Sequence, residues 1–383
     1  MTAPARGAVR GRDLATGGLL EIEHDGGVIS SVRRLGSGAS DVPFLAPGFV
    51  DLQVNGFAGH DVNGPDSSAE EVAAITAALA RTGVTTWLPT IITASEEQIV
   101  HSLRAVAEAR AADPTVAAAI PGVHVEGPFI SEVEGARGVH DPAQIRPLDP
   151  AEVRRWETPG APLEILTVSP HGPDAPERIA EITALGISVA IGHTHATADE
   201  VRAAADAGAS LSTHLGNGMP SLIPRHPNAI WAQLADDRLA AGLIADGHHL
   251  PADTLTSMLR AKPSQGAFLV SDATALAGCA PGTYTAPVGG AVVLDADGRL
   301  SAAGTGYLAG AALGLAEGVR LAALAAGIGL AAAVRLATIN PARQLRRARP
   351  GLGSLTVGAP ADCVLLDGTG HVVEVVQGGR TVA

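Results

Sequence analysis

The stretch "ISVAIGHTHATADEVRAAADAGASLSTHLGNG" (187–218) decides the fold, because two apolar runs flank a helical pattern within it. The runs 187–196 and 209–218 begin with apolar residues and end with His and other polar residues. Between them, a Thr-x-x-Glu capping box at Thr197–Glu200 begins a helix that ends at a glycine. A strand, a helix and a second strand in this order predict a β-α-β unit with parallel strands.

The same pattern continues outward from this stretch in both directions. Candidate buried strands lie at 48–56, 83–90, 118–128, 163–172, 187–196, 209–218, 239–250 and 266–275. Eight strands with helical crossovers predict an α/β fold, a (β/α)8 TIM-type barrel, and a doubly wound parallel sheet is the alternative. Short strand patterns at both chain ends predict a small β-sandwich domain from 1–46 and 347–383, which leaves 47–346 for the barrel.

The overall composition limits the class of protein. The chain has 383 residues, of which 46% are hydrophobic, and a formal net charge of −13. Such an acidic chain does not attract nucleic acid or an anionic membrane by its bulk charge. There are two cysteines, no signal-peptide pattern and no apolar run of the roughly 18–20 residues that a membrane span needs. We therefore expect a cytoplasmic protein.

Polar residues gather at the ends of the predicted strands, where barrels of this type carry their active sites. Candidates for one common mouth are His124, Glu126, His171, His193, His195, His214, Asn217, His248, His249 and Asp272. Among them, Glu126, His193 and His214 end the third, fifth and sixth strands. One carboxylate and two imidazoles form a ligand set for a catalytic divalent ion, which acidifies water and polarises a carbonyl. We expect one ion per subunit, Zn²⁺ first and Fe²⁺ or Mn²⁺ as alternatives.

Two further residues are predicted to act on a substrate. Asp272 ends the eighth strand, where a carboxylate opposite the ion would serve as general base and then as general acid. The structural alternative for Asp272 is the N-cap of a following helix. His140 lies in the glycine-rich loop "GARGVHD", from which it could hydrogen-bond a substrate carbonyl or hydroxyl group. The alternative for His140 is an ordinary loop histidine.

An anionic substrate group would need a local cluster of donors in so acidic a chain. Arg225 in "IPRHPN" and His249 in "ADGHHL" are candidates for a phosphate, and Asn217 and Gly218 could add donors. Arg225 could instead be an ordinary surface residue. The chain has a single lysine, Lys262, which is not at a strand end, so a carboxylated-lysine metal bridge and a Schiff base are both excluded.

Taken together, several motifs make the sequence similar to one known family. They are "HVEGPFI" (124–130), "GHT" (192–194), "THLGNGMP" (213–220), "ADGHH" (245–249) and "SDA" (271–273). With them the chain resembles the N-acetylglucosamine-6-phosphate deacetylases of the metal-dependent amidohydrolase superfamily, from about residue 47 to residue 340. The resemblance implies hydrolysis of the N-acetyl amide of N-acetylglucosamine 6-phosphate to glucosamine 6-phosphate and acetate. It assigns Glu126, His193 and His214 to the metal, Asp272 to general base and acid catalysis, and His140 to substrate contact.

The resemblance also implies a homodimer. Arg225 and His249 match phosphate contacts that this family supplies from the neighbouring subunit, and Asn217 and Gly218 match residues near the phosphate. Gln53 and Asn55 stand where the wider superfamily has a His-x-His pair for a second ion. Amides are poor ligands for such an ion, so we interpret the pair as vestigial second-metal positions that hydrogen-bond water or neighbouring polar groups.

Several positions depart from the family pattern and leave the substrate open. The family usually has larger residues than Gly216, Gly218, Ala311 and Gly314 at these places, and His195 is an additional imidazole that could recruit a second ion. One alternative is a related amidohydrolase acting on N-acetylgalactosamine 6-phosphate or on an unphosphorylated sugar. A non-catalytic sugar-binding barrel is another alternative, although binding alone does not require a carboxylate–His–His set facing an aspartate.

Overall fold

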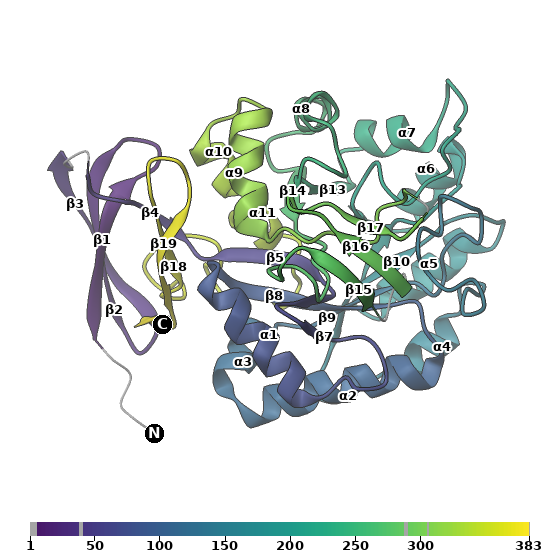
Figure 1. The fold of residues 1–383 in the computed structure, drawn as a ribbon, viewed down its shortest axis with the longest axis horizontal. Coiled ribbons are helices and arrows are strands. Elements are labelled where there is room, and N and C mark those ends of the chain that lie inside the picture. The colour runs from purple at the N-terminus through teal and green to yellow at the C-terminus, as the bar shows by residue number, and fades with distance from the viewer. Residues whose placement is uncertain (1–5, 38–40, 287–289, 305, 383) are drawn as a thin grey trace.

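Eight parallel strands form the centre of the molecule. The computed structural model describes residues 6–37, 41–286, 290–304 and 306–382. The eight strands are β5 (Phe49–Val54), β8 (Val84–Ile92), β9 (Val123–Glu126), β10 (Leu163–Val168), β11 (Ser188–Ile191), β12 (Leu211–Ser212), β13 (Ala240–Ile244) and β14 (Ala267–Val270). They lie in the sheet in chain order (Figure 1). A parallel bridge between Val54 and Ala273 joins the first strand to the segment after the last, so the barrel prediction is confirmed.

The predicted strands are present, and most are shorter than the predicted runs, but β8 extends two residues beyond its run, to Ile92. The run 118–128 begins inside a short helix, α3 (Pro114–Ala119), and the strand itself starts at Val123. The Asp113 side chain caps this helix, and a proline occupies its first turn, where a missing N–H costs nothing. Alanine and valine are compatible with both structures, so the periodicity of this run could not place the boundary.

Helices cover the outside of the barrel. They are α1 (Ala69–Arg81), α2 (Glu96–Ala112), α3, α4 (Pro150–Arg155), α5 (Ala175–Ala184), α6 (Ala198–Asp206), α7 (Ala229–Ala235), α8 (Ala252–Ala261), α9 (Leu315–Ala325), α10 (Leu330–Leu336) and α11 (Ile339–Ala342). The capping box predicted from sequence is confirmed at α6, where the side chains of Thr197 and Glu200 each accept from the other's backbone N–H.

A second, smaller β domain combines both ends of the chain (Figure 1). Its strands are β1 (Gly7–Asp13), β2 (Gly18–Asp25), β3 (Val28–Ser37), β4 (Phe44–Pro47), β18 (Cys363–Leu366), β19 (Val372–Gln377) and β20 (Arg380–Thr381). They form one sheet in the order β20-β19-β18-β4-β1-β2-β3, with an apolar core of its own that includes Ile22 and Cys363. The predicted fold class is confirmed, and the exact limits 1–46, 47–346 and 347–383 stay a prediction.

The structure adds small sheets that the sequence did not indicate. An antiparallel sheet of β15 (Gly282–Ala286), β16 (Gly290–Leu294) and β17 (Leu300–Ala302) follows the last barrel strand. A short hairpin of β6 (Gly56–Phe57) and β7 (His60–Asp61) follows the first barrel strand. Residues of the antiparallel sheet line the cavity described below, so this insertion forms part of the wall around the barrel mouth.

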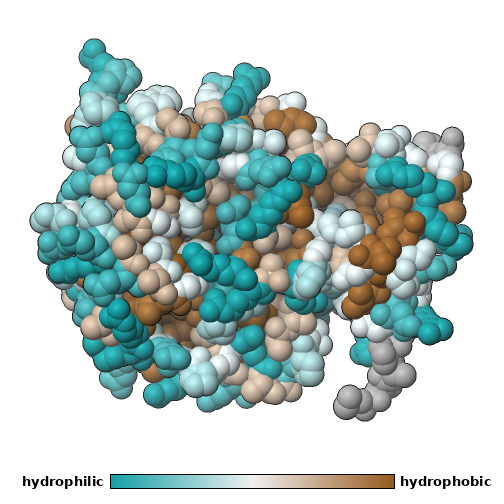
Figure 2. Space-filling model, turned by 180° about the vertical axis from the view of Figure 1, so that it is seen from behind, coloured by the Kyte–Doolittle hydropathy of each residue, from teal (hydrophilic) through white to brown (hydrophobic). Residues whose placement is uncertain are grey.

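The surface is mostly polar over the barrel. On the rear face, Figure 2 shows teal residues over most of the barrel and brown residues gathered on the small β domain. Exposed apolar side chains of that domain include Val28, Leu35 and Val373. Within the described part of the chain, no helix is both long and apolar enough to cross a membrane.

Candidate metal centre

Glu126, His193 and His214 meet at one end of the barrel. Glu126 is the last residue of β9, while His193 and His214 each lie two residues after the end of a strand. Oε1 of Glu126 lies 2.9 Å from Nε2 of His214 and 3.2 Å from Nε2 of His193, and the two Nε2 atoms are 3.0 Å apart. All three side chains are buried. Among the described residues, this is the only group of three or more His, Cys, Asp or Glu side chains close enough to share an ion.

The chemistry of this donor set fits a divalent ion. Nδ1 of His193 lies 2.8 Å from the carbonyl oxygen of Ala136, a contact that requires a proton on Nδ1 and leaves Nε2 free to act as a ligand. Burial opposes ionisation of Glu126, but its interactions with His193 and His214 outweigh the effect of burial and hold the pKa of Glu126 well below its ordinary value. The site therefore combines an ionised carboxylate with two imidazole nitrogens, a set that suits Zn²⁺, Fe²⁺ or Mn²⁺.

Unusual backbone conformations direct these side chains. His193, His214 and Asp272 have φ angles of 46°, 27° and 51°, in the left-handed region that non-glycine residues rarely adopt. Hydrogen bonds hold the carbonyl groups of all three residues, for example from the N–H of Ser131 to His193 at 2.9 Å. Strain of this kind is characteristic of functional sites, where the surrounding structure supports it.

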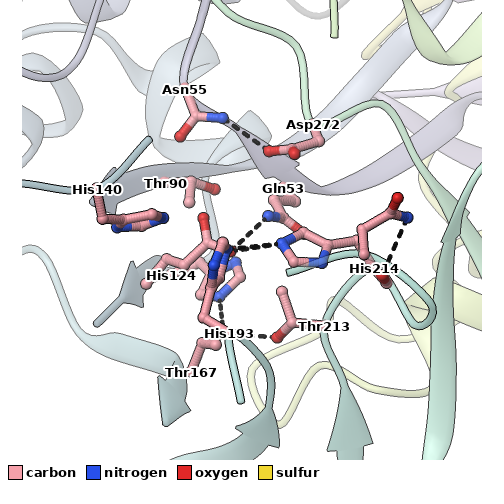
Figure 3. Close-up of polar contacts among 12 residues, drawn as sticks. Gln53, Asn55, Thr90, His124, His140, Thr167, His193, Thr213, His214 and Asp272 are labelled. Atoms are coloured by element: carbon pink, nitrogen blue, oxygen red, sulfur yellow. Dashed lines mark hydrogen bonds and ion pairs between the residues drawn. The ribbon is translucent and has the colours of Figure 1, made fainter. Parts of the chain in front are cut away.

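Asp272 lies at the same barrel mouth and is buried. Its Oδ1 accepts a hydrogen bond of 2.9 Å from Nδ2 of Asn55 (Figure 3). Burial and the nearby charge of Glu126 raise the pKa of Asp272 to about 6, which suits a group that must both accept and donate a proton near neutral pH. No helix follows β14 before β15, so the alternative interpretation of Asp272 as a helix N-cap is wrong.

His140 also belongs to this site rather than to a remote loop. Its ring packs edge-on against that of His193, with centroids 4.3 Å apart, and its Nδ1 lies 2.8 Å from Oγ1 of Thr93. Burial, with the neighbouring His193, lowers the pKa of His140 to about 3. His140 is therefore a neutral hydrogen-bonding group at physiological pH.

A cavity of about 640 Å³ opens over these residues. It is lined by Asn55, Glu126, His140, His193, His214, Asn217, Gly218, His249 and Asp272, together with apolar residues such as Leu300 of the insertion and Leu308 just after it. This size and this mixture of apolar walls with a few converging polar groups are typical of a site for a small molecule.

The two predicted phosphate contacts lie in different places. His249 lines the cavity of its own chain, and its Nδ1 lies 2.7 Å from Oδ2 of Asp246. This position differs from our expectation that His249 reaches a neighbouring subunit. Arg225 lies on the exposed segment 221–227, outside its own chain's cavity, next to Leu222, which is 92% exposed.

Four of the other strand-end histidines do not line the cavity. His124 is buried beneath it, with Nε2 2.7 Å from Oγ1 of Thr167. His195 is exposed, its ring lies tilted against that of His171 with centroids 4.6 Å apart, and its Nδ1 contacts Oγ of Ser131. His248 contacts the carbonyl of a loop residue in the insertion. His195 therefore does not supply a second ligand set beside Glu126.

Sequence reasoning missed the partners of Gln53 and Asn55, and the role of Thr93. Nε2 of Gln53 donates to Oε1 of Glu126 at 3.1 Å, and Asn55 binds Asp272 as described above. Thr93 contacts His140. The alternation of polar residues along β5 was a signal for the amides, since residues two apart share a face, but no sequence signal marked Thr93.

Comparison with known proteins agrees with this site. The model of the amidohydrolase family matches residues 44–382. N-acetylgalactosamine-6-phosphate deacetylase from a Shewanella species is 35% identical over 336 residues, which cover 88% of this chain and 82% of the relative. Human N-acetylglucosamine-6-phosphate deacetylase is 35% identical over 355 residues, covering 88% of this chain and 83% of the human protein. The identity and the coverage of both matches show common ancestry along nearly the whole chain.

A solved structure is similar over the same extent. It is a variant of N-acetylglucosamine-6-phosphate deacetylase from Mycobacterium smegmatis in complex with N-acetylglucosamine 6-phosphate, 29% identical with a TM-score of 0.86. The match covers 99% of this chain and 100% of the other. The chain thus belongs to the amidohydrolase family, a class of hydrolases. Within that family it is a member of the N-acetylglucosamine-6-phosphate deacetylase group.

Proposed function

We propose that this protein hydrolyses the N-acetyl amide of N-acetylglucosamine 6-phosphate to glucosamine 6-phosphate and acetate. The observation that carries the proposal is the buried carboxylate of Asp272 at the same cavity as the Glu126–His193–His214 trio. Relatives named for this activity support the choice of substrate. A barrel that only bound a sugar would have no need of a ligand trio beside a buried proton acceptor.

The residues divide the reaction between them. A divalent ion held by Glu126, His193 and His214, with Zn²⁺ our first candidate, would supply Lewis acidity that polarises the amide carbonyl and acidifies water. Asp272 accepts the proton of the attacking water and returns it to the amine nitrogen as the C–N bond breaks. His140 is held through Nδ1 by Thr93, which leaves its Nε2 for a hydrogen bond to the substrate.

The phosphate would be bound from two chains. His249, Asn217 and the backbone of Gly218 line the cavity and contribute from the same chain. Arg225, which lies outside this cavity, would reach it from the second subunit of a homodimer. The exposed position of Arg225, beside an almost fully exposed Leu222, supports such an interface. We further propose a cytoplasmic location, since both cysteines are free thiols.

N-acetylgalactosamine 6-phosphate is a second candidate substrate. Two relatives at 35% and 33% identity are named N-acetylgalactosamine-6-phosphate deacetylase. The two sugars differ only in the orientation of one hydroxyl group, so the same ion, base and phosphate contacts would serve both.

An acetate-release assay tests both candidates. The purified protein, with its metal content measured, is given each phosphorylated sugar and the two unphosphorylated N-acetyl sugars. We expect the highest kcat/KM with N-acetylglucosamine 6-phosphate. A higher value with the galactosamine isomer would favour the second candidate, and no acetate from any of the four sugars by metal-loaded protein would overturn the proposed function.

A further inference from the structure

The two amides that replace a His-x-His pair at the end of β5 each meet a different functional carboxylate. Gln53 and Asn55 are two residues apart, share a face of the strand, and are 1% and 8% exposed. Gln53 donates to Glu126. Asn55 donates to Asp272 (Figure 3). If the two amides were only vestiges of a second metal site, they would need hydrogen-bond partners but no particular ones. They could then contact each other or any nearby backbone group.

Gln53 contacts the same oxygen atom that faces both imidazoles. Its Nε2 lies 3.1 Å from Oε1 of Glu126, the atom that lies within 3.2 Å of His193 and His214. An amide N–H on this oxygen orients the carboxylate without adding a charge that would repel the ion. Hydrogen bonds of this kind to metal-binding side chains typically contribute 10- to 100-fold in metal affinity.

Asn55 holds the other carboxylate by one oxygen only. Its Nδ2 lies 2.9 Å from Oδ1 of Asp272, and Oδ2 of Asp272 has no hydrogen bond to any described residue. The Asn55 backbone is itself fixed, because its N–H donates to the carbonyl of Ala273 at 2.8 Å. The side chain therefore keeps Asp272 in one orientation and leaves its second oxygen to exchange a proton.

We propose that Gln53 and Asn55 are positioning residues with separate tasks: Gln53 orients Glu126 for the ion, and Asn55 orients Asp272 for proton transfer. The part that concerns Asn55 rests on the proposed function. The part that concerns Gln53 depends only on metal binding. We assign separate tasks because the contacts are separate: among the described residues, the side chain of Gln53 donates only to Glu126, and that of Asn55 donates only to Asp272.

The test compares Gln53→Met and Asn55→Leu, which keep the approximate shape and remove the donor. Affinity for Zn²⁺ is measured on metal-free protein with a competing chelator, and kcat and KM are measured for N-acetylglucosamine 6-phosphate at saturating Zn²⁺. Gln53→Met should bind Zn²⁺ 10- to 100-fold more weakly, with a metal-saturated kcat within about threefold of the wild type. Asn55→Leu should keep its Zn²⁺ affinity and lose about tenfold or more in kcat, with KM nearly unchanged.

Asn63 provides a matched control. It is another buried amide near the same strands, but it contacts the backbone of β8 and does not line the cavity. Asn63→Leu should lower the melting temperature while Zn²⁺ affinity and kcat of the folded protein stay close to wild type.

Three outcomes would overturn the inference. The first is that both variants lower Zn²⁺ affinity and kcat together, and the second is that neither changes either quantity. The third is a wild-type protein that binds Zn²⁺ but releases acetate from no sugar. This result would overturn both the proposed function and the role proposed for Asn55. In that last case the Zn²⁺ affinity of Gln53→Met still tests whether Gln53 orients Glu126 for the ion.

Discussion

Nε2 of His214 lies 2.9 Å from Oε1 of Glu126, although the two residues are 88 positions apart in the chain. The contact joins the mouth-side ends of β9 and β12, which are not neighbours in the sheet. Only a curved sheet brings side chains from such strands together, because in a flat sheet two intervening strands would separate them by well over 10 Å. The three predicted metal ligands can therefore meet only because the sheet is closed into a barrel.

Removing the ion should abolish activity reversibly. Treatment with a chelator should stop acetate release, and added Zn²⁺ should restore it in the wild type but not in Glu126→Gln, which lacks the charged ligand. Elemental analysis after gel filtration measures the bound metal. Glu132→Gln, a change at an exposed carboxylate close in sequence, is the control and should recover fully. Retention of one tightly bound ion by Glu126→Gln would contradict the assignment.

Asp272→Asn should separate metal binding from catalysis. The amide keeps the shape of the carboxylate but cannot accept a proton, so kcat should fall by roughly 10²- to 10⁴-fold. The metal content should equal that of the wild type, because Asp272 is outside the trio. Steady-state acetate release and elemental analysis on one sample check both parts. Turnover close to the wild-type rate would show that another group transfers the proton.

Arg225 should act across a subunit interface. Arg225→Ala should raise KM for the phosphorylated sugar by roughly 10-fold or more and leave turnover of the free sugar unchanged, since the charged contact is made only with phosphate.

A mixing experiment identifies which chain supplies Arg225. Arg225→Ala and Asp272→Asn proteins are unfolded together and refolded, so that hybrid dimers form. A hybrid has one site with both Asp272 and the partner's arginine, so activity should return above that of either parent. If Arg225 served its own site, every site in the mixture would lack one of the two groups and no activity would return.

Buried His124 should make stability fall in mildly acidic solution. Burial lowers the pKa of His124 to about 4, against 6.5 for an ordinary histidine. Between these values the unfolded chain binds a proton that the folded chain does not, so stability decreases as pH falls through this window. From pH 7 to pH 5 the loss for this residue is about 2 kcal/mol.

The matching variant is His124→Asn, which cannot titrate. Its free energy of unfolding, measured by urea denaturation at equal metal content, should fall about 2 kcal/mol less than that of the wild type over the same pH range. Parallel curves for the two proteins would show that His124 takes up its proton in the folded state.

The single lysine should be a structural residue. Lys262 is buried, and its Nζ donates to the carbonyl groups of Gln233, Asp236 and Leu239 at 2.6, 2.8 and 2.7 Å. Lys262→Met leaves these carbonyls without their donor and should cost about 3 kcal/mol or more in the free energy of unfolding. Arg260→Met, an exposed change on the same helix α8, is the control and should change stability by less than about 0.5 kcal/mol. A stable Lys262→Met protein would contradict this role.

Local patterns predicted much of the molecule correctly. The apolar runs located all eight barrel strands, and the capping box at Thr197 located the start of α6, because both signals arise from residues close together in the chain. The grouping of Glu126, His193 and His214 at one place was also predicted, since every barrel strand ends at the same face, and their role as metal ligands stays a prediction. The insertion β15–β17 was not predicted, because its short strands depend on pairing with one another and carry no strong pattern.

The sequence by itself determined which residues could do chemistry here: the strand ends supplied one carboxylate, two imidazoles and an aspartate, and a lone lysine excluded other mechanisms. Only the tertiary structure decided their partners. Gln53 meets Glu126 across 73 positions and Asn55 meets Asp272 across 217, while His195, one more strand-end imidazole, turns away towards His171. The reason is physical: residue type and local period place a side chain on a face of its own strand, whereas its neighbour depends on the stagger between strands when the barrel closes.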